Sequence, residues 1–160
     1  MADYFLDSSA VIKRYINERG SRFIDGLVDL EYGNNVFLAQ ITIVEVASAF
    51  ARRRKGKTLA DKDAATALES FTIELADIYL TVEISTEVVI AATEIATKHA
   101  LRGYDAVQLA AALAANRDLT ANGYNALTFV SADDDLNSGA LAEGLGVENP
   151  NDYDTNEGAG

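Results

Sequence analysis

The chain has 160 residues, no cysteine and a formal net charge of −12 at pH 7. Its length suits a single domain with one core, and the absence of cysteine excludes disulfides and thiolate metal sites. It carries neither a secretory signal nor a run of roughly 18 apolar residues, so we expect a cytoplasmic protein without a membrane partner.

Short apolar runs alternate with segments whose apolar residues have helical spacing. In chain order, we expect strands at 4–7, 36–39, 79–84 and 127–130 and helices at 21–31, 42–55, 61–77, 86–100, 105–116 and 134–145. Strands that alternate with helices predict an α/β fold around a central, mostly parallel sheet. We expect one domain over residues 1–148 and a polar, flexible tail over 149–160.

The charges are unevenly distributed along the chain. Residues 1–57 carry nine basic and seven acidic side chains, whereas the remainder carries four basic and eighteen acidic ones. A basic run ends the helix expected at 42–55, and it consists of Arg52, Arg53, Arg54 and Lys55. Cations are favoured at a helix C-terminus by the helix dipole, which is a structural explanation for the run. The alternative is that the run contacts a substrate or an acidic partner.

Four acidic residues stand where expected strands end or where the following helices begin. Asp7 ends the first strand, and Glu45 lies in the first helical turn after the second. Asp105 opens an alanine-rich helix, and Asp133 follows the last strand. Because sites in parallel α/β folds lie beyond the carboxyl ends of the strands, we expect these four carboxylates to converge.

Each acid also has a structural explanation when it is taken alone. Glu45 fits a helix capping box with Thr42, and Asp105 fits an N-cap with Gln108 three residues later. The other two acids fit turns in which a carboxylate accepts a backbone N–H. Convergence distinguishes the explanations, because clustered carboxylates repel one another unless a cation neutralises them.

The chemistry of such a cluster follows from its ligands. Oxygen ligands without cysteine or paired histidines suit Mg²⁺ or Mn²⁺ rather than zinc. Ions of this kind keep several waters and reach substrate phosphates, so hydrolysis of a phosphodiester is the reaction that they favour. No Gly-rich phosphate-binding loop of the P-loop type is found. The second acid of an Asp-x-Asp phosphohydrolase motif is also absent, because position 9 is Ser9.

The segments around the four acids resemble the four motifs of PIN-domain ribonucleases, in the order of that family. These segments are Tyr4-Phe-Leu-Asp7-Ser8-Ser9-Ala10-Val11-Ile12, Thr42-Ile-Val-Glu45-Val, Tyr104-Asp105-Ala106-Val107-Gln108-Leu109-Ala110 and Val130-Ser131-Ala132-Asp133. Within the family, the chain is most similar to the VapC-type toxins of VapBC toxin–antitoxin systems. One such motif is a weak signal, whereas four in order, over most of the chain, are specific.

The resemblance implies a three-layer α/β/α sandwich and an endoribonuclease that uses Mg²⁺ or Mn²⁺. It also implies a cognate antitoxin that covers the site, with a homodimer or a hetero-oligomer as the assembly. Asp7, Glu45, Asp105 and Asp133 take the acidic positions of the family, as catalytic residues and metal ligands. The alternative function is a non-catalytic PIN-like module that binds protein or RNA.

Four further residues have roles that the sequence leaves open. Ser8 and Ser131 match positions where the family carries a supporting hydroxyl. Asp135 is an alternative to Asp133 as the fourth acid, although a helical turn between them would point it elsewhere. Arg102 is either a solvated loop cation or a contact to a substrate phosphate.

Overall fold

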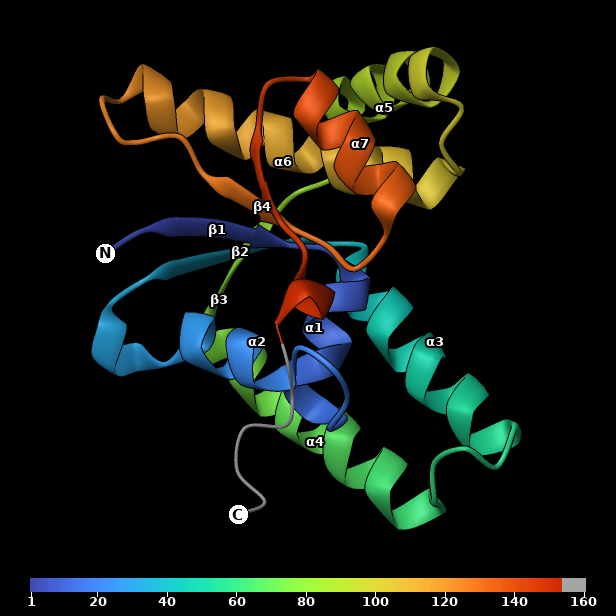
Figure 1. The fold of residues 1–160 in the computed structure, drawn as a ribbon. Coiled ribbons are helices and arrows are strands. Elements are labelled where there is room, and N and C mark those ends of the chain that lie inside the picture. Colours follow the sequence, from blue (N-terminus) through green and yellow to red (C-terminus); the bar gives the residue numbers. More distant parts are fainter. Residues whose placement is uncertain (154–160) are drawn as a thin grey trace.

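The computed structural model describes residues 1–153, which fold into an α/β/α sandwich (Figure 1). The strands are β1 (Asp3–Leu6), β2 (Asn35–Ala39), β3 (Tyr79–Val82), β4 (Thr128–Val130) and β5 (Gly146–Glu148). The α-helices are α1 (Ser8–Tyr15), α2 (Ser21–Val28), α3 (Thr42–Lys55), α4 (Asp61–Asp77), α5 (Thr86–His99), α6 (Gly103–Ala121) and α7 (Asp134–Ala142). Two 3-10 helices are also present, η1 (Leu30–Tyr32) and η2 (Pro150–Asp152). The predicted fold class is confirmed.

The sheet is parallel throughout, with the strand order β3-β2-β1-β4-β5. The chain lays β2 and β3 on one side of β1 and then returns to place β4 on the other side. At such a reversal of strand order, the connections after two neighbouring strands leave toward opposite faces and open a crevice between them. The register pairs Leu6 of β1 with Val130 of β4, so the next residues, Asp7 and Ser131, lie side by side.

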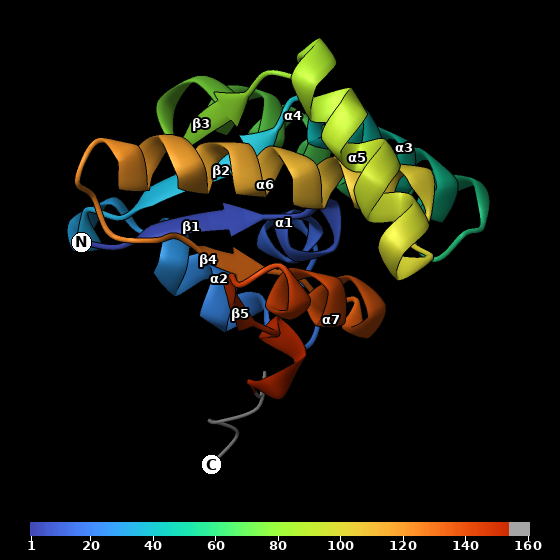
Figure 2. The ribbon, with the colours of Figure 1, turned by 90° about the horizontal axis from the view of Figure 1, so that it is seen from above.

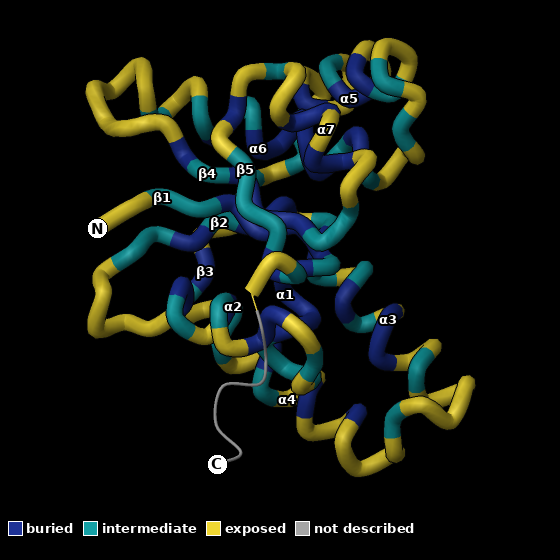
Figure 3. The backbone as a smooth tube through the Cα atoms, in the orientation of Figure 1, coloured by how far each residue is buried: buried dark blue, intermediate teal, exposed yellow. Residues whose placement is uncertain are grey.

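Each face of the sheet carries its own layer of helices and its own core (Figures 1 and 2). Helices α5, α6 and α7 cover the face on which Phe5 and Phe129 stack, with ring centroids 5.7 Å apart. Helices α1 to α4 cover the other face, where Leu6 and Val130 are buried. Buried residues are concentrated in the middle of the molecule, between the two helical layers (Figure 3). In the described chain, no helix is both long and apolar enough to span a bilayer.

Three elements differ clearly from the sequence expectation. Helix α1 begins at Ser8, where the sequence predicted a turn, because Asp7 caps it by accepting a 3.0 Å hydrogen bond from the Ala10 N–H. Strand β5 was not predicted, since three residues show no periodicity. The helix expected at 105–116 is also longer than predicted, since α6 begins at Gly103 and runs to Ala121.

The last described residues pack against α2. Residues 149–153 were assigned to the tail, but η2 contacts α2, and Tyr153 stacks on Phe23 with ring centroids 3.9 Å apart. Gly20, which precedes α2, has φ +86°, and a Cβ at this position would lie 2.3 Å from the Pro150 carbonyl oxygen. The remainder of the predicted tail, 154–160, lies outside the described residues.

Replacing Gly20 with alanine is expected to loosen the packing of η2 against α2. The backbone is left-handed and the added Cβ meets a carbonyl oxygen, so the chain at Pro150 must move. Gly123→Ala is the matched control, because Gly123 has φ +82° but open space around it. We expect the control to lose about 1–2 kcal/mol of unfolding free energy and Gly20→Ala to lose at least about 1 kcal/mol more. Equal losses in urea denaturation would contradict the packing role of Gly20.

Candidate active site

A pocket of about 310 Å³ lies at the carboxyl ends of the central strands, and all four predicted acids line it. Asp7 follows β1, and Glu45 lies in the first turn of α3. Asp105 lies in the first turn of α6, and Asp133 caps α7. The structure thus brings together side chains that are up to 126 residues apart in the sequence, as positions 7 and 133 are.

Asp7 is the most buried of the four acids, with 4% of its surface exposed. Its Oδ1 accepts hydrogen bonds from the Ser9 hydroxyl at 2.7 Å and the Ala10 N–H at 3.0 Å. Its Oδ2 accepts one from the Ser131 hydroxyl at 2.8 Å. The pKa of Asp7 is raised from 3.8 to about 6: burial raises it most, the three hydrogen bonds lower it in part, and the charge of Asp105 adds to the rise. This carboxylate is firmly positioned yet poorly solvated, so a nearby cation would stabilise it.

Glu45 is held at both of its carboxylate oxygens. The Ser8 hydroxyl donates to Oε2 at 2.7 Å, and the side-chain amide of Gln108 donates to Oε1 at 3.1 Å. Gln108 is 1% exposed, and its Nε2 also lies 3.0 Å from the Ser8 hydroxyl and 2.8 Å from that of Thr42. The capping box predicted for Thr42 and Glu45 is not formed, because the N-cap of α3 is Ile41 and the Thr42 hydroxyl is turned toward Gln108.

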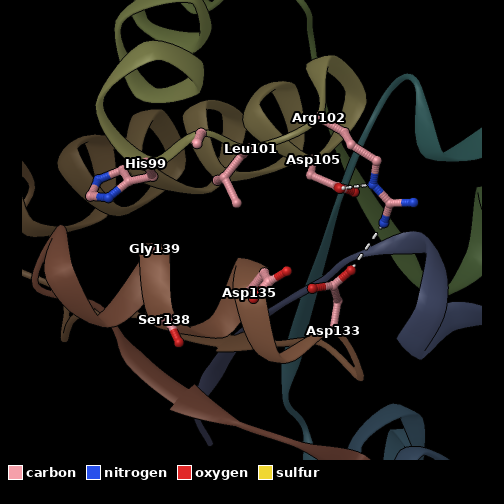
Figure 4. A pocket seen from close by; sticks show the side chains of 9 residues that line it. His99, Leu101, Arg102, Asp105, Asp133, Asp135, Ser138 and Gly139 are labelled. Atoms are coloured by element: carbon pink, nitrogen blue, oxygen red, sulfur yellow. Dashed lines mark hydrogen bonds and ion pairs between the residues drawn. The ribbon is translucent and has the colours of Figure 1, made fainter.

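Arg102 joins the other two acids. Its Nε donates to Asp105 Oδ2 at 2.8 Å, and its Nη2 donates to Asp133 Oδ2 at 3.1 Å (Figure 4). Asp105 is not the N-cap that the sequence suggested, since Arg102 holds that position and the helix begins at Gly103. Asp133 does cap a helix, because its Oδ1 accepts from the Leu136 N–H at 3.0 Å, while Oδ2 faces the pocket.

A family model described as PIN domain matches residues 4–140. The chain belongs to the PIN-domain family. The match includes most of β1, all of β4 and all four acids of the pocket, so the resemblance found in the sequence is confirmed. No curated protein matches this PIN domain at the level of sequence.

Solved structures share the fold of this PIN domain at low sequence identity. VapBC2 from Rickettsia felis, bound to a DNA fragment from its promoter, has a TM-score of 0.63 and 15% identity over 92% of this chain and 98% of that one. PAE2754 from Pyrobaculum aerophilum has a TM-score of 0.65 and 16% identity over 93% and 90%. FitAcB from Neisseria gonorrhoeae has a TM-score of 0.57 and 19% identity over 92% and 97%. At these identities the likeness establishes the fold.

The donor set of this PIN-domain pocket fits a divalent cation. Its four acids offer hard oxygen ligands, which suit Mg²⁺ or Mn²⁺. The buried carboxylate of Asp7 lacks a cationic partner among the described residues, whereas Asp105 and Asp133 share Arg102. In the described part of the chain, no three His, Cys, Asp or Glu side chains are grouped closely enough to hold a metal ion as they stand. A bound ion would therefore require the carboxylates to close in.

Of the other residues whose roles the sequence left open, two contact the acids of the pocket and one lies outside it. Ser8 and Ser131 touch Glu45 and Asp7 as supporting hydroxyls. Asp135 does not line the four-acid pocket but a neighbouring hollow of about 510 Å³, which Asp105 and Asp133 also border (Figure 4).

The basic run at the end of α3 is divided by its surroundings. Arg52 lines the acidic pocket, while Arg53 is paired with Glu18 at 3.1 Å. Arg54 and Lys55 are exposed and make no ion pair with the described residues. Of the four cations predicted as partner contacts, only Arg52 reaches the pocket.

Gln108 and Ser9 are the positioning residues that sequence reasoning missed. The Ser9 hydroxyl donates to Asp7 and accepts a 2.9 Å bond from the Ala132 N–H, which ties the start of α1 to the loop after β4. The signal for Gln108 was present, because it is a lone amide in the apolar run Val107-Gln-Leu-Ala-Ala-Ala-Leu-Ala114. A polar side chain on a buried helix requires a buried partner.

Proposed function

We propose that the protein is a metal-dependent endoribonuclease and the toxin of a type II toxin–antitoxin pair. The observation that carries the proposal is the meeting of Asp7, Glu45, Asp105 and Asp133 in one pocket at the carboxyl edge of a PIN-domain sheet. Clustered carboxylates at a strand edge serve metal-assisted phosphodiester hydrolysis better than they serve folding, because their mutual repulsion destabilises the metal-free fold.

The roles of the residues follow from their surroundings. Asp7, Asp105 and Asp133 would hold Mg²⁺ or Mn²⁺, with Glu45 as a direct ligand or as the acceptor of a proton from a bound water. The ion supplies Lewis-acid stabilisation of phosphate charge and a water of lowered pKa. Ser9 and Ser131 fix the orientation of Asp7, and the hydrogen-bonded amide of Gln108 fixes that of Glu45.

A cognate antitoxin and self-association belong to the same proposal. Two solved structures that share the fold of this chain are VapBC2 and FitAcB. The first bears the name of the VapBC toxin–antitoxin systems, which supports an antitoxin as a partner here. An antitoxin with an acidic segment would find cations beside the pocket, where Arg52 is exposed. We propose a homodimer, or a hetero-oligomer with the antitoxin, as the cellular form.

The competing function is a non-catalytic PIN-like module. A nuclease requires metal to release RNA products, whereas a binding module releases none. The nuclease should cut single-stranded and structured RNA only when Mg²⁺ or Mn²⁺ is present, and Asp105→Asn should abolish the cleavage. Asp118→Asn is the matched control, because Asp118 lies on the same helix with 78% of its side chain exposed. Equal cleavage by both variants, or cleavage in chelator, would refute the proposal. A binding module would retain RNA affinity and release no products.

RNA binding is expected to depend on Arg52 more than on its neighbours. Replacing Arg52, Arg53 and Arg54 together by alanine should raise the KM for RNA and flatten its dependence on KCl, because fewer phosphate contacts release fewer counterions. Arg52→Ala alone should lower the slope of log KM against log salt by about 0.7, the value for one contact to a single strand. Arg53→Ala is the matched control, since Glu18 already neutralises that guanidinium. An unchanged salt slope in the triple variant would remove the basic run from substrate binding.

A further inference from the structure

Arg102 lies across the acidic pocket in a position that nothing in the helix requires. It is the residue before α6, and its side chain makes no capping hydrogen bond to that helix. The guanidinium instead reaches between Asp105 and Asp133, which come from different elements (Figure 4). One guanidinium therefore pairs with two of the four acids of the pocket.

Arg102 and a metal ion would compete for the same carboxylate oxygens. Arg102 donates to Oδ2 of Asp105 and to Oδ2 of Asp133, and the remaining Oδ1 of Asp133 already accepts from the N–H of Leu136. A metal ion that approached Asp133 from the pocket would meet the oxygen that Arg102 occupies. Binding of the guanidinium and binding of the ion are therefore competitive at this residue.

Breaking the two Arg102 ion pairs costs little free energy in this geometry. Its side chain is 80% exposed, so water can replace the carboxylates as a partner. Exposed ion pairs contribute little to stability, and Arg102 has a long side chain that is not held by packing. A divalent ion attracts the same carboxylates more strongly, because it carries twice the charge and approaches them more closely.

The displaced guanidinium would remain at the site. Arg102 borders the four-acid pocket and both neighbouring hollows, one beside α7 and one beside α5. A guanidinium offers several N–H donors in a planar fork that matches the oxygens of a phosphate. Arg102 could therefore bind a phosphate next to the scissile bond of an RNA that lies in either hollow.

We propose that Arg102 is an exchangeable counter-ion of the site. It bridges Asp105 and Asp133 in the metal-free protein and moves to a substrate phosphate once the metal is bound. This inference rests on the proposed metal-dependent nuclease and adds a residue to it. It predicts that one variant, Arg102→Ala, changes metal affinity and RNA affinity in opposite directions. Loss of Arg102 should improve metal binding and impair the use of RNA.

Calorimetric titration with Mn²⁺ alone tests the first expectation on the whole chain. We expect Arg102→Ala to bind Mn²⁺ about five-fold more tightly than the unmodified protein, the change that two exposed ion pairs account for. Arg52→Ala is the matched control, because it removes an equal charge from the same pocket wall without breaking a contact to an acid. We expect a change of less than about two-fold there, since only long-range repulsion is relieved. Arg102→Lys, which keeps the charge and loses the fork, should fall between them.

Steady-state cleavage at saturating Mn²⁺ tests the second expectation. Arg102→Ala should raise the KM for RNA by about ten-fold, as expected for one charge-assisted contact, with a smaller change in kcat. Equal metal affinity in the two alanine variants, or weaker metal binding without Arg102, would overturn the inference while leaving the nuclease intact. An unchanged KM would overturn the transfer to phosphate. If no variant bound Mn²⁺, the proposed function would fail, and this inference with it.

Discussion

Asp7→Asn is expected to abolish RNA cleavage and, in the absence of metal, to stabilise the fold at neutral pH. A ligand that contributes several kcal/mol to transition-state stabilisation accounts for a loss of at least about 1,000-fold in kcat/KM. The gain in stability has a separate cause. Burial raises the pKa of Asp7 to about 6, so keeping this carboxylate ionised in the folded protein destabilises it.

The dependence on pH follows from the direction of that shift. Because the pKa of Asp7 is raised from 3.8 to about 6 on folding, the folded protein holds this proton more tightly than the unfolded chain. The stability contributed by the protonated carboxyl is fully present below pH 3.8 and is lost as the pH rises through about 6. Two pKa units correspond to about 3 kcal/mol.

Thermal unfolding of both proteins in chelator measures this difference. Asp7→Asn should unfold at a higher temperature than the unmodified protein at pH 8, and the difference should disappear near pH 4. Asparagine keeps an oxygen for the Ala10 N–H, and its amide can donate to the Ser131 hydroxyl, so the local hydrogen bonds survive. Saturating Mn²⁺ should reverse the order, since it stabilises only the protein that binds it. A variant that is less stable at pH 8, or a gap that does not change with pH, would contradict the desolvation of Asp7.

Gln108→Leu is expected to lower both stability and activity, although Gln108 is not a catalytic residue. The substitution keeps the volume of the side chain but leaves the fully buried Thr42 hydroxyl without its partner and one oxygen of Glu45 without a donor. A loss of about 1–3 kcal/mol in unfolding free energy follows from the buried polar group. A loss of about 10- to 100-fold in kcat/KM follows from the freed Glu45, because residues that orient a metal ligand carry effects of this size.

Thr42→Val separates the two consequences. It removes the same buried hydroxyl contact but leaves Gln108 bonded to Glu45, so stability should fall while kcat/KM changes by less than in Gln108→Leu. Urea denaturation and RNA cleavage at saturating Mn²⁺ would measure the pair. If both variants lost activity in proportion to stability, Gln108 would act through the fold alone.

The convergence of the four acids in one pocket was predictable because it depends on the sheet. Apolar runs at 4–7 and 127–130 identified the two strands that become β1 and β4, and parallel strands place the residues that follow them at the same edge. Asp7 and Asp133 were therefore found from local pattern and topology together. Helix α1 was missed for a local reason: Ser8 and Ser9 have turn chemistry, and their hydroxyls are instead used by Glu45 and Asp7.

The contacts that complete the site were not predictable from sequence spacing. Gln108 reaches Ser8 across 100 residues, and Arg102 reaches Asp133 across 31. Each side chain also had a plausible local role, one in a capping motif and the other in a solvated loop. Only the packing that brings the start of α6 to the acidic pocket gives them a shared site with the acids.

Anomalous scattering from crystals grown with Mn²⁺ tests most directly whether the four acids form one metal site. We expect a manganese peak in the pocket, about 2.1 Å from carboxylate oxygens of Asp7 and Asp105, and no such peak in Asp7→Asn crystals grown in the same way. A peak only at other acids of the surface, or a pocket without manganese at a saturating concentration, would contradict a metal site at the four acids.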